Sequence, residues 1–193
     1  MHVDPSLTDE REFMPAVNVW CPLSDVTAAN GCLQVVPGSH HHASLLRPVS
    51  TWGMVGHPFG GVLPLLNATY AQNIEMAAGE AIIFSCKLLH GSGPNMSADR
   101  RVSFQSIVIP LEAPIVHSVM VSPTEAELFE VDDSFFWSHL FGTRPSQAKS
   151  LGVVEHKLSQ FSEADVLQSP YLRGAPAFPK LNRWFSSWTG RKH

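Results

Sequence analysis

The chain has 193 residues, of which 44% are hydrophobic and 16% charged, the composition of one ordinary globular domain. Its formal net charge is −4, from 13 basic and 17 acidic side chains. It therefore lacks the overall positive field that holds nucleic acid or an anionic membrane surface, and we expect neither as a partner. Ten histidines beside 17 carboxylates suggest metal or proton chemistry.

The cysteines and the apolar segments indicate the compartment. Cys21, Cys32 and Cys86 are odd in number and widely spaced, which suits reduced thiols better than a disulfide framework. The first residues lack the basic and apolar regions of a secretory signal. The uncharged run 48–74 is interrupted by prolines and glycines, so it is not a membrane helix. We expect a soluble cytoplasmic protein.

The first two thirds of the chain have the pattern of an all-β protein. Short apolar runs between glycine and proline turns predict strands over 13–23, 32–36, 81–84 and 102–109. Strands at this spacing favour a sandwich or barrel. The segment 48–70 is too long and glycine-rich for a simple connection, so it is either a lid over the substrate or a surface loop.

Beyond Pro123 the pattern changes. Residues 124–129 and 133–141 predict short helices, the second with Asp132 or Asp133 as its N-cap, and Ser162 predicts the start of another. The basic, aromatic tail 183–193, with Trp184 and Trp188, is expected to pack on the domain. We predict a β core over residues 1–122 and a helical or irregular extension over 123–193 packed on it.

The motif His2-Val3-Asp4 offers two metal-ligating side chains. Residues separated by one position point to the same face of an extended strand, so both can reach one ion. An imidazole and a carboxylate together suit a divalent transition metal. A His-x-Asp triplet also arises by chance, so the motif needs further support.

A third candidate ligand is His90, which an apolar run delivers to the glycine-rich turn containing Ser92. Its imidazole would lie at the mouth of a barrel, although a histidine satisfied within the turn is the alternative. Arg101 begins the next strand, and side chains on adjacent antiparallel strands can project into one cavity. The planar guanidinium binds a carboxylate with two parallel hydrogen bonds.

Together His2, Asp4 and His90 make the two-histidine, one-carboxylate triad that holds non-heme Fe(II) and leaves coordination positions open. Those positions can accept a chelating 2-oxo acid and O₂. Arg101 would bind the far carboxylate of that acid. The pieces form a coherent site, which none of them does alone.

The order and spacing of these motifs resemble the phytanoyl-CoA dioxygenase family of Fe(II)/2-oxoglutarate oxygenases. The resemblance runs from residue 2 to the region of residue 110, and Arg101 lies at the family's interval from His90. The stretches that carry it are His2-Val3-Asp4, Trp20-Cys21-Pro22-Leu23 with Asp25, Asn30-Gly31-Cys32-Leu33, Pro37-Gly38-Ser39-His40, Gly79-Glu80, and His90 to Asn95 with Ser97 and Arg101.

This resemblance implies a mainly β fold, a double-stranded β-helix (jelly roll, cupin-like) with short C-terminal helices. It implies that His2, Asp4 and His90 are the catalytic metal ligands. It also implies that Arg101 binds 2-oxoglutarate, assisted by Ser92 and Trp20. The implied cofactors are Fe(II), 2-oxoglutarate and O₂, and the implied reaction hydroxylates a small organic or lipid-like substrate with release of succinate and CO₂.

The remaining charged candidates have simpler explanations. Arg100 is expected to be solvated, and His40 belongs to the family pattern. His41 and His42 are expected to be exposed, and His57 could face the substrate from the glycine-rich segment. The others are expected at surface or packing positions: His117, His139, His156 and His193.

Members of this family usually carry a substantial region before the His-x-Asp motif, whereas one residue precedes it here. We expect a truncated gene product, a shortened chain or a degenerate paralogue. His2 should then lie on a terminus that frays unless it is held, with reduced iron affinity. A missing strand would expose a sheet edge, which a second copy of the chain or another partner could cover.

Two other functions stay open. A non-catalytic jelly roll that binds a ligand or partner without turnover is favoured by the short N-terminus, whereas the intact triad and Arg101 favour the oxygenase. A hydrolase using Zn²⁺ is weaker, because no general base is recognisable near the triad and Arg101 would have no role.

Overall fold

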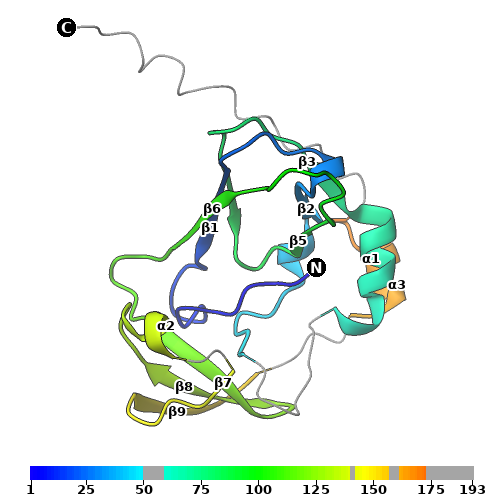
Figure 1. Cartoon of the computed structure of the whole chain (residues 1–193). Helices are drawn as coiled ribbons and strands as arrows, with labels where there is room; N and C mark the ends of the chain where they lie inside the picture. Colours follow the sequence, from blue (N-terminus) through cyan, green and yellow to red (C-terminus); the bar gives the residue numbers. More distant parts are fainter. Residues whose placement is uncertain (50–58, 140–141, 157–160, 173–193) are drawn as a thin grey trace, which may run out of the picture.

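The computed structural model describes residues 1–49, 59–139, 142–156 and 161–172. Within these ranges the strands form three antiparallel sheets, with short helices beside them (Figure 1). The strands are β1 (Val17–Pro22), β2 (Leu33–Val35), β3 (Gln72–Ile74), β4 (Ile82–Ser85), β5 (His90–Ser92), β6 (Ser103–Val108), β7 (Val116–Ser122), β8 (Glu125–Glu130) and β9 (Lys149–Glu155). The helices are α1 (Leu63–Tyr70), α2 (Phe135–Ser138) and α3 (Glu163–Gln168), with single 3-10 turns at η1 (Ala28–Asn30), η2 (Ser39–His41) and η3 (Gly60–Val62).

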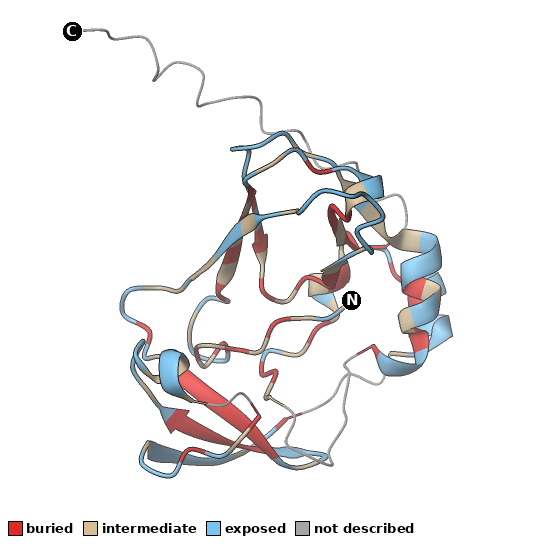
Figure 2. Ribbon diagram, in the orientation of Figure 1, coloured by how far each residue is buried: buried red, intermediate tan, exposed pale blue. Residues whose placement is uncertain are grey.

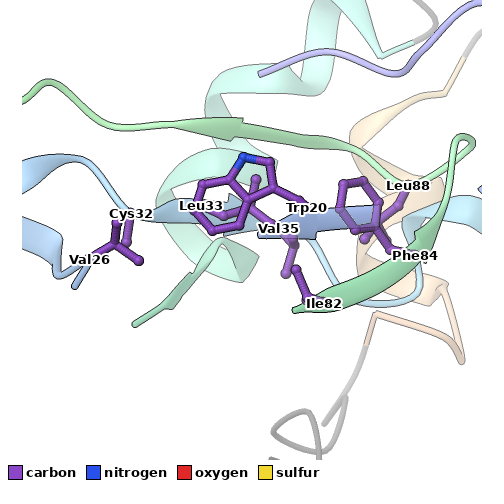
Figure 3. Packing of buried hydrophobic residues seen from close by; sticks show 8 residues of the cluster. All are labelled: Trp20, Val26, Cys32, Leu33, Val35, Ile82, Phe84 and Leu88. Carbon is purple, nitrogen blue, oxygen red and sulfur yellow. The ribbon is translucent and has the colours of Figure 1, made fainter. Parts of the chain in front are cut away.

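Two of the sheets, with strand orders β4-β1-β6 and β3-β2-β5, enclose one apolar core. Alternation along β1 buries Trp20, which packs with Leu33 and Val35 of β2 and Phe84 of β4 (Figure 3). Aromatic and β-branched side chains favour such a pleated surface. The predicted mainly β jelly roll is confirmed, and each of the four predicted strand regions overlaps an observed strand.

The third sheet, β7-β8-β9, includes one segment for which the sequence predicts a helix. The prediction of a helix over 124–129 is wrong, because these residues form β8, paired with β7 and β9. Glutamate, alanine and leucine have high helix propensity, but tertiary packing overrides it. Ala126 and Leu128 pack against Leu46 of the first part of the chain. Ser122, where the core is predicted to end, pairs with Glu125 inside this hairpin.

The helices agree with the sequence in part. α2 lies within the predicted range 133–141, and α3 begins after Ser162, whose hydroxyl accepts a hydrogen bond from the Asp165 N–H. The segment 48–70 is not entirely a loop, since it contains η3 and α1. α1 and α3 lie side by side and share an apolar cluster through Leu66 and Val166 (Figure 1). No described helix has the length and apolarity needed to cross a membrane.

Some predictions fall on residues that the structure does not describe. These are the expected lid or loop over 50–58 with His57, the end of the range 133–141, and the tail with Trp184, Trp188 and His193.

Two buried histidines around the third sheet should make the fold sensitive to acid. β7 is mostly buried (Figure 2). Its His117 is 2% exposed and packs against the Phe135 ring, and His156 after β9 is 4% exposed. Burial lowers the pKa of both below the ordinary value of 6.5. The unfolded chain therefore takes up protons at a higher pH than the folded chain does. Each histidine then destabilises the fold as pH falls below about 6.5, by at most about 1.4 kcal/mol per pH unit.

We expect the free energy of unfolding, measured with urea between about pH 7.5 and 5.5, to be level at first and to fall below about pH 6.5. His156→Phe keeps a ring but removes the titrating group, so it should make the decline shallower. His41→Phe changes an exposed position and should leave the decline of the free energy of unfolding as steep as in the native chain. A free energy of unfolding that stays constant across this range would contradict the prediction.

Candidate metal centre

His2 and Asp4 lie on an extended segment beside β5 (Figure 1). The His2 N–H donates to the His90 carbonyl oxygen at 2.8 Å, and the His90 N–H donates to the His2 carbonyl oxygen at 2.9 Å. Pro5 disfavours a helical backbone at Asp4. Val3 packs into the apolar cluster around α1, whereas its two neighbours face His90. The alternation predicted for an extended His-x-Asp motif is therefore observed.

This pairing shows that the segment expected to fray is held at His2. β5 pairs with β2 on one side, and His2 pairs with His90 on the other. The Asp4 N–H donates to the Cys86 carbonyl oxygen at 3.0 Å, which fixes the segment at a second point. The His2 side chain is 59% exposed, whereas those of Asp4 and His90 are 9% and 6% exposed. The backbone of the segment is thus held while one candidate ligand stays open to solvent.

Three candidate ligand atoms converge on one point. Oδ1 of Asp4 lies 3.6 Å from Nε2 of His2 and 3.8 Å from Nε2 of His90. Two donors bound at about 2.1 Å to one ion can be at most about 4.2 Å apart, so both separations can be bridged by a single ion. Among the described residues no other group of three or more histidine, cysteine or acidic side chains is arranged for a metal.

His90 is oriented so that Nε2 faces this point. Its Nδ1 lies 2.9 Å from the Leu88 carbonyl oxygen, so Nδ1 carries the proton and Nε2 keeps its lone pair for an ion. Burial lowers the pKa of His90, which favours the neutral imidazole that a metal requires. The buried Ser39 hydroxyl accepts the Leu89 N–H at 2.8 Å and so fixes the residue before the ligand.

The Asp4 carboxylate is fixed by a residue that sequence reasoning missed. Nδ2 of Asn18, a fully buried side chain in β1, donates to Oδ2 of Asp4 at 3.1 Å and leaves Oδ1 facing the histidines. Burial raises the pKa of Asp4, but the histidines and Asn18 outweigh it, so the pKa lies below its usual value. The available signal was a polar residue at an inward position of a strand.

Asn18→Ala should weaken Fe(II) binding by about tenfold, because the outer oxygen of Asp4 loses the donor that orients it. Equilibrium dialysis of Fe(II) under nitrogen measures this. Asn73→Ala is a matched control, since Asn73 on β3 is exposed and its amide oxygen accepts from Gln34, which is not a candidate ligand. Equal affinity in Asn18→Ala and the native chain would show that the amide does not orient the carboxylate.

The three residues predicted to bind a 2-oxo acid also come together. Nη1 of Arg101 lies 3.4 Å from the Ser92 hydroxyl, and its guanidinium lies 5.9 Å from the centre of the Trp20 ring. Ser92 follows His90 by two positions in β5, so both side chains share one face of the strand. Arg101 thus contacts the strand that carries His90, two positions beyond it, while Arg100 is exposed as expected.

Residues 37–42 contact the C-terminal part of the described chain, around Ser169 and Tyr171. Gly38 has φ +83°, and a Cβ there would lie 2.3 Å from the Tyr171 carbonyl oxygen, so glycine is required. His41 is exposed, but its ring stacks on Tyr171 at 3.9 Å. His42 is half-buried, not exposed as predicted, because its Nε2 bonds to the Ser169 hydroxyl at 2.8 Å. His41 and His42 therefore join residues 37–42 to the segment that contains Ser169 and Tyr171.

Comparison with known proteins assigns a family. The family model described as phytanoyl-CoA dioxygenase matches residues 1–103. A probable phytanoyl-CoA dioxygenase of Caenorhabditis elegans is 36% identical over 77 residues, which cover 39% of this chain and 25% of the relative. A phytanoyl-CoA dioxygenase of Arabidopsis thaliana is 33% identical over 91 residues, which cover 47% of this chain and 31% of the relative.

Among solved structures, the carbocyclase SnoK from nogalamycin biosynthesis is similar at a TM-score of 0.48 and 19% identity, covering 77% of this chain and 57% of that one. The chain spans only about a quarter to a third of the length of the two curated relatives above. The family model nevertheless matches more than half of the 193 residues, from His2 through Arg101. The chain belongs to the phytanoyl-CoA dioxygenase family.

Proposed function

We propose that this protein is an Fe(II)- and 2-oxoglutarate-dependent oxygenase that hydroxylates a small organic or lipid-like substrate and releases succinate and CO₂. One observation carries the proposal. The side chains of His2, Asp4 and His90, from two segments far apart in the sequence, meet within 4.8 Å of one another, with Arg101 on the same side of β5. Membership of the phytanoyl-CoA dioxygenase family supports it.

The donor set fits the ion. Two imidazole nitrogens and one carboxylate oxygen are the ligands of the facial triad that binds non-heme Fe(II), with coordination positions left for other molecules. Iron bound there would supply the O₂ chemistry of the reaction. His90 contributes a neutral imidazole held by Leu88, and Asp4 contributes a charged carboxylate held by Asn18.

Arg101 supplies the charge that a dicarboxylic cosubstrate requires. 2-Oxoglutarate chelates a metal through its oxo acid end and keeps a second carboxylate at the far end. The guanidinium can bind that carboxylate through two parallel hydrogen bonds. The Trp20 ring and the Ser92 hydroxyl contact the guanidinium and would hold it in place for this role.

The names of the relatives support the class of substrate. Both curated relatives quoted above are named for phytanoyl-CoA, the thioester of a branched fatty acid. A lipid-like substrate is therefore one candidate for this chain, and a smaller organic molecule is the other. A substrate panel that contains acyl-CoA esters and free carboxylic acids separates the two.

The proposal is tested by adding Fe(II) to the metal-free protein under nitrogen, then 2-oxoglutarate and air, and measuring succinate. We expect succinate formation that requires Fe(II) and is not supported by Zn²⁺. Tight Fe(II) binding without any succinate, in the presence or absence of candidate substrates, would favour the non-catalytic jelly roll instead.

A further inference from the structure

A buried ion pair contacts the segment that carries Asp4, one of the candidate metal ligands. The side chains of Arg47 and Glu10 are 3% and 0% exposed. Nη1 and Nη2 of Arg47 donate to the two carboxylate oxygens of Glu10 at 2.8 and 2.6 Å. Removing two charges from water is costly, and a buried pair is weak evidence for a role in stability alone. The pair therefore calls for a further role.

The same guanidinium reaches a candidate metal ligand. Nε of Arg47 donates to the main-chain carbonyl oxygen of Asp4 at 2.7 Å, and Nη1 also donates to the Ser44 carbonyl oxygen. The N–H of Asp4 donates to the Cys86 carbonyl oxygen on the other side. The main chain of Asp4 is thus held by hydrogen bonds at both of its polar groups.

The segment around Arg47 is itself aligned with the segment that carries Asp4. The Ser6 N–H donates to the Arg47 carbonyl oxygen at 3.1 Å, and the Arg47 N–H donates to the Ser6 hydroxyl at 3.0 Å. Ser6 is 1% exposed. These bonds fix the main chain of Arg47 beside Ser6, and the guanidinium is bound to the Asp4 carbonyl oxygen. Both the main chain and the side chain of Arg47 are therefore fixed relative to Asp4.

We propose that Arg47, oriented by Glu10, is a positioning residue for the metal ligand Asp4. It holds the Asp4 main chain so that the carboxylate points at the two histidines before an ion binds, which lowers the cost of ordering the site. The inference rests on the proposed function, because it assigns Asp4 to the metal. Lysine cannot replace Arg47, since a single ammonium does not reproduce the planar fork.

The test compares metal affinity with stability in four chains. Arg47→Lys keeps the charge, and the double variant Arg47→Met/Glu10→Leu replaces the pair by apolar groups, which buried ion pairs often tolerate without loss of stability. Arg144→Lys is the control. Arg144, whose side chain is 62% exposed, also pairs with a glutamate, Glu127, through two bonds of 2.8 Å, but contacts none of the three candidate ligands. The native chain completes the set.

Two quantities are measured for each chain. One is the dissociation constant for Fe(II) under nitrogen, together with the visible spectrum of the Co²⁺-loaded protein. The other is the thermal midpoint of the metal-free protein. We expect both Arg47 variants to bind Fe(II) about tenfold more weakly and to change the Co²⁺ spectrum. The double variant should keep its midpoint, and Arg144→Lys should bind as the native chain does.

The outcomes separate the two proposals. If the native chain binds no Fe(II), the proposed function is wrong and this inference is overturned with it. If the native chain binds but the Arg47 variants bind equally well, only the inference is overturned. Failure of both Arg47 variants to fold would also overturn it, because the pair would then serve the fold alone.

Discussion

Replacing His90 by alanine is expected to weaken Fe(II) binding by at least about 100-fold and to abolish iron-dependent succinate formation. Loss of an outer partner of a metal ligand already costs roughly 10- to 100-fold, and this change removes a ligand itself. His90 is the buried histidine of the site, with Nε2 3.8 Å from the Asp4 carboxylate. The remaining histidine, His2, is largely exposed, so His2 and Asp4 alone should hold the ion much more weakly.

The measurement is an anaerobic Fe(II) titration followed by the succinate assay. His90 also contacts the Phe84 ring, so the free energy of unfolding of the metal-free variant must be measured beside its affinity. His41→Ala removes an exposed histidine outside the site and should leave both affinity and succinate formation unchanged. Normal iron affinity in a folded His90→Ala protein would remove His90 from the ligand set.

Arg101→Ala is expected to raise the KM for 2-oxoglutarate by roughly 10- to 100-fold while leaving Fe(II) affinity unchanged. Hydrogen bonds to a charged partner contribute about 1.5–3 kcal/mol, which corresponds to this range. Arg101 contacts Ser92 and Trp20 but none of the three candidate metal ligands. Loss of Arg101 should therefore weaken the binding of 2-oxoglutarate and leave the binding of Fe(II) unchanged.

The rate of succinate formation as a function of 2-oxoglutarate concentration measures this effect. Arg100→Ala is the matched control, since the neighbouring arginine is exposed and should not alter the KM. Arg101→Lys should lie between the native chain and Arg101→Ala, because it keeps the charge but loses the fork. An unchanged KM in Arg101→Ala, or a larger effect in Arg100→Ala, would reject Arg101 as the cosubstrate residue.

The metal centre was predictable where its chemistry is local in the sequence. His2 and Asp4 are two positions apart, and so are His90 and Ser92, so residue type and spacing indicate their roles. Asn18 and Arg47 contact Asp4 from positions 14 and 43 residues away, and no local pattern connects them. Only the fold shows which polar residue at an inward position supports a ligand.

In the fold, too, the features set by local sequence were predictable, whereas those set by contacts between distant segments were not. Trp20, Leu33 and Phe84 lie in apolar runs between turn residues, and all three were predicted in strands that the structure contains. The helix predicted over 124–129 follows propensity, yet pairing with β7 and β9 makes it a strand. The expected fraying of His2 rests on its place at the terminus, whereas its pairing with His90 depends on a contact between distant segments.

The most direct test of the central claim is the fate of oxygen from ¹⁸O₂ in the succinate that the native, Fe(II)-loaded protein forms. In the proposed reaction the oxidative loss of CO₂ from 2-oxoglutarate places one atom of O₂ in the new carboxylate of succinate. We expect singly labelled succinate in the native protein and none above background in His90→Ala. Absence of labelled succinate from the native protein at saturating iron and 2-oxoglutarate would contradict the account.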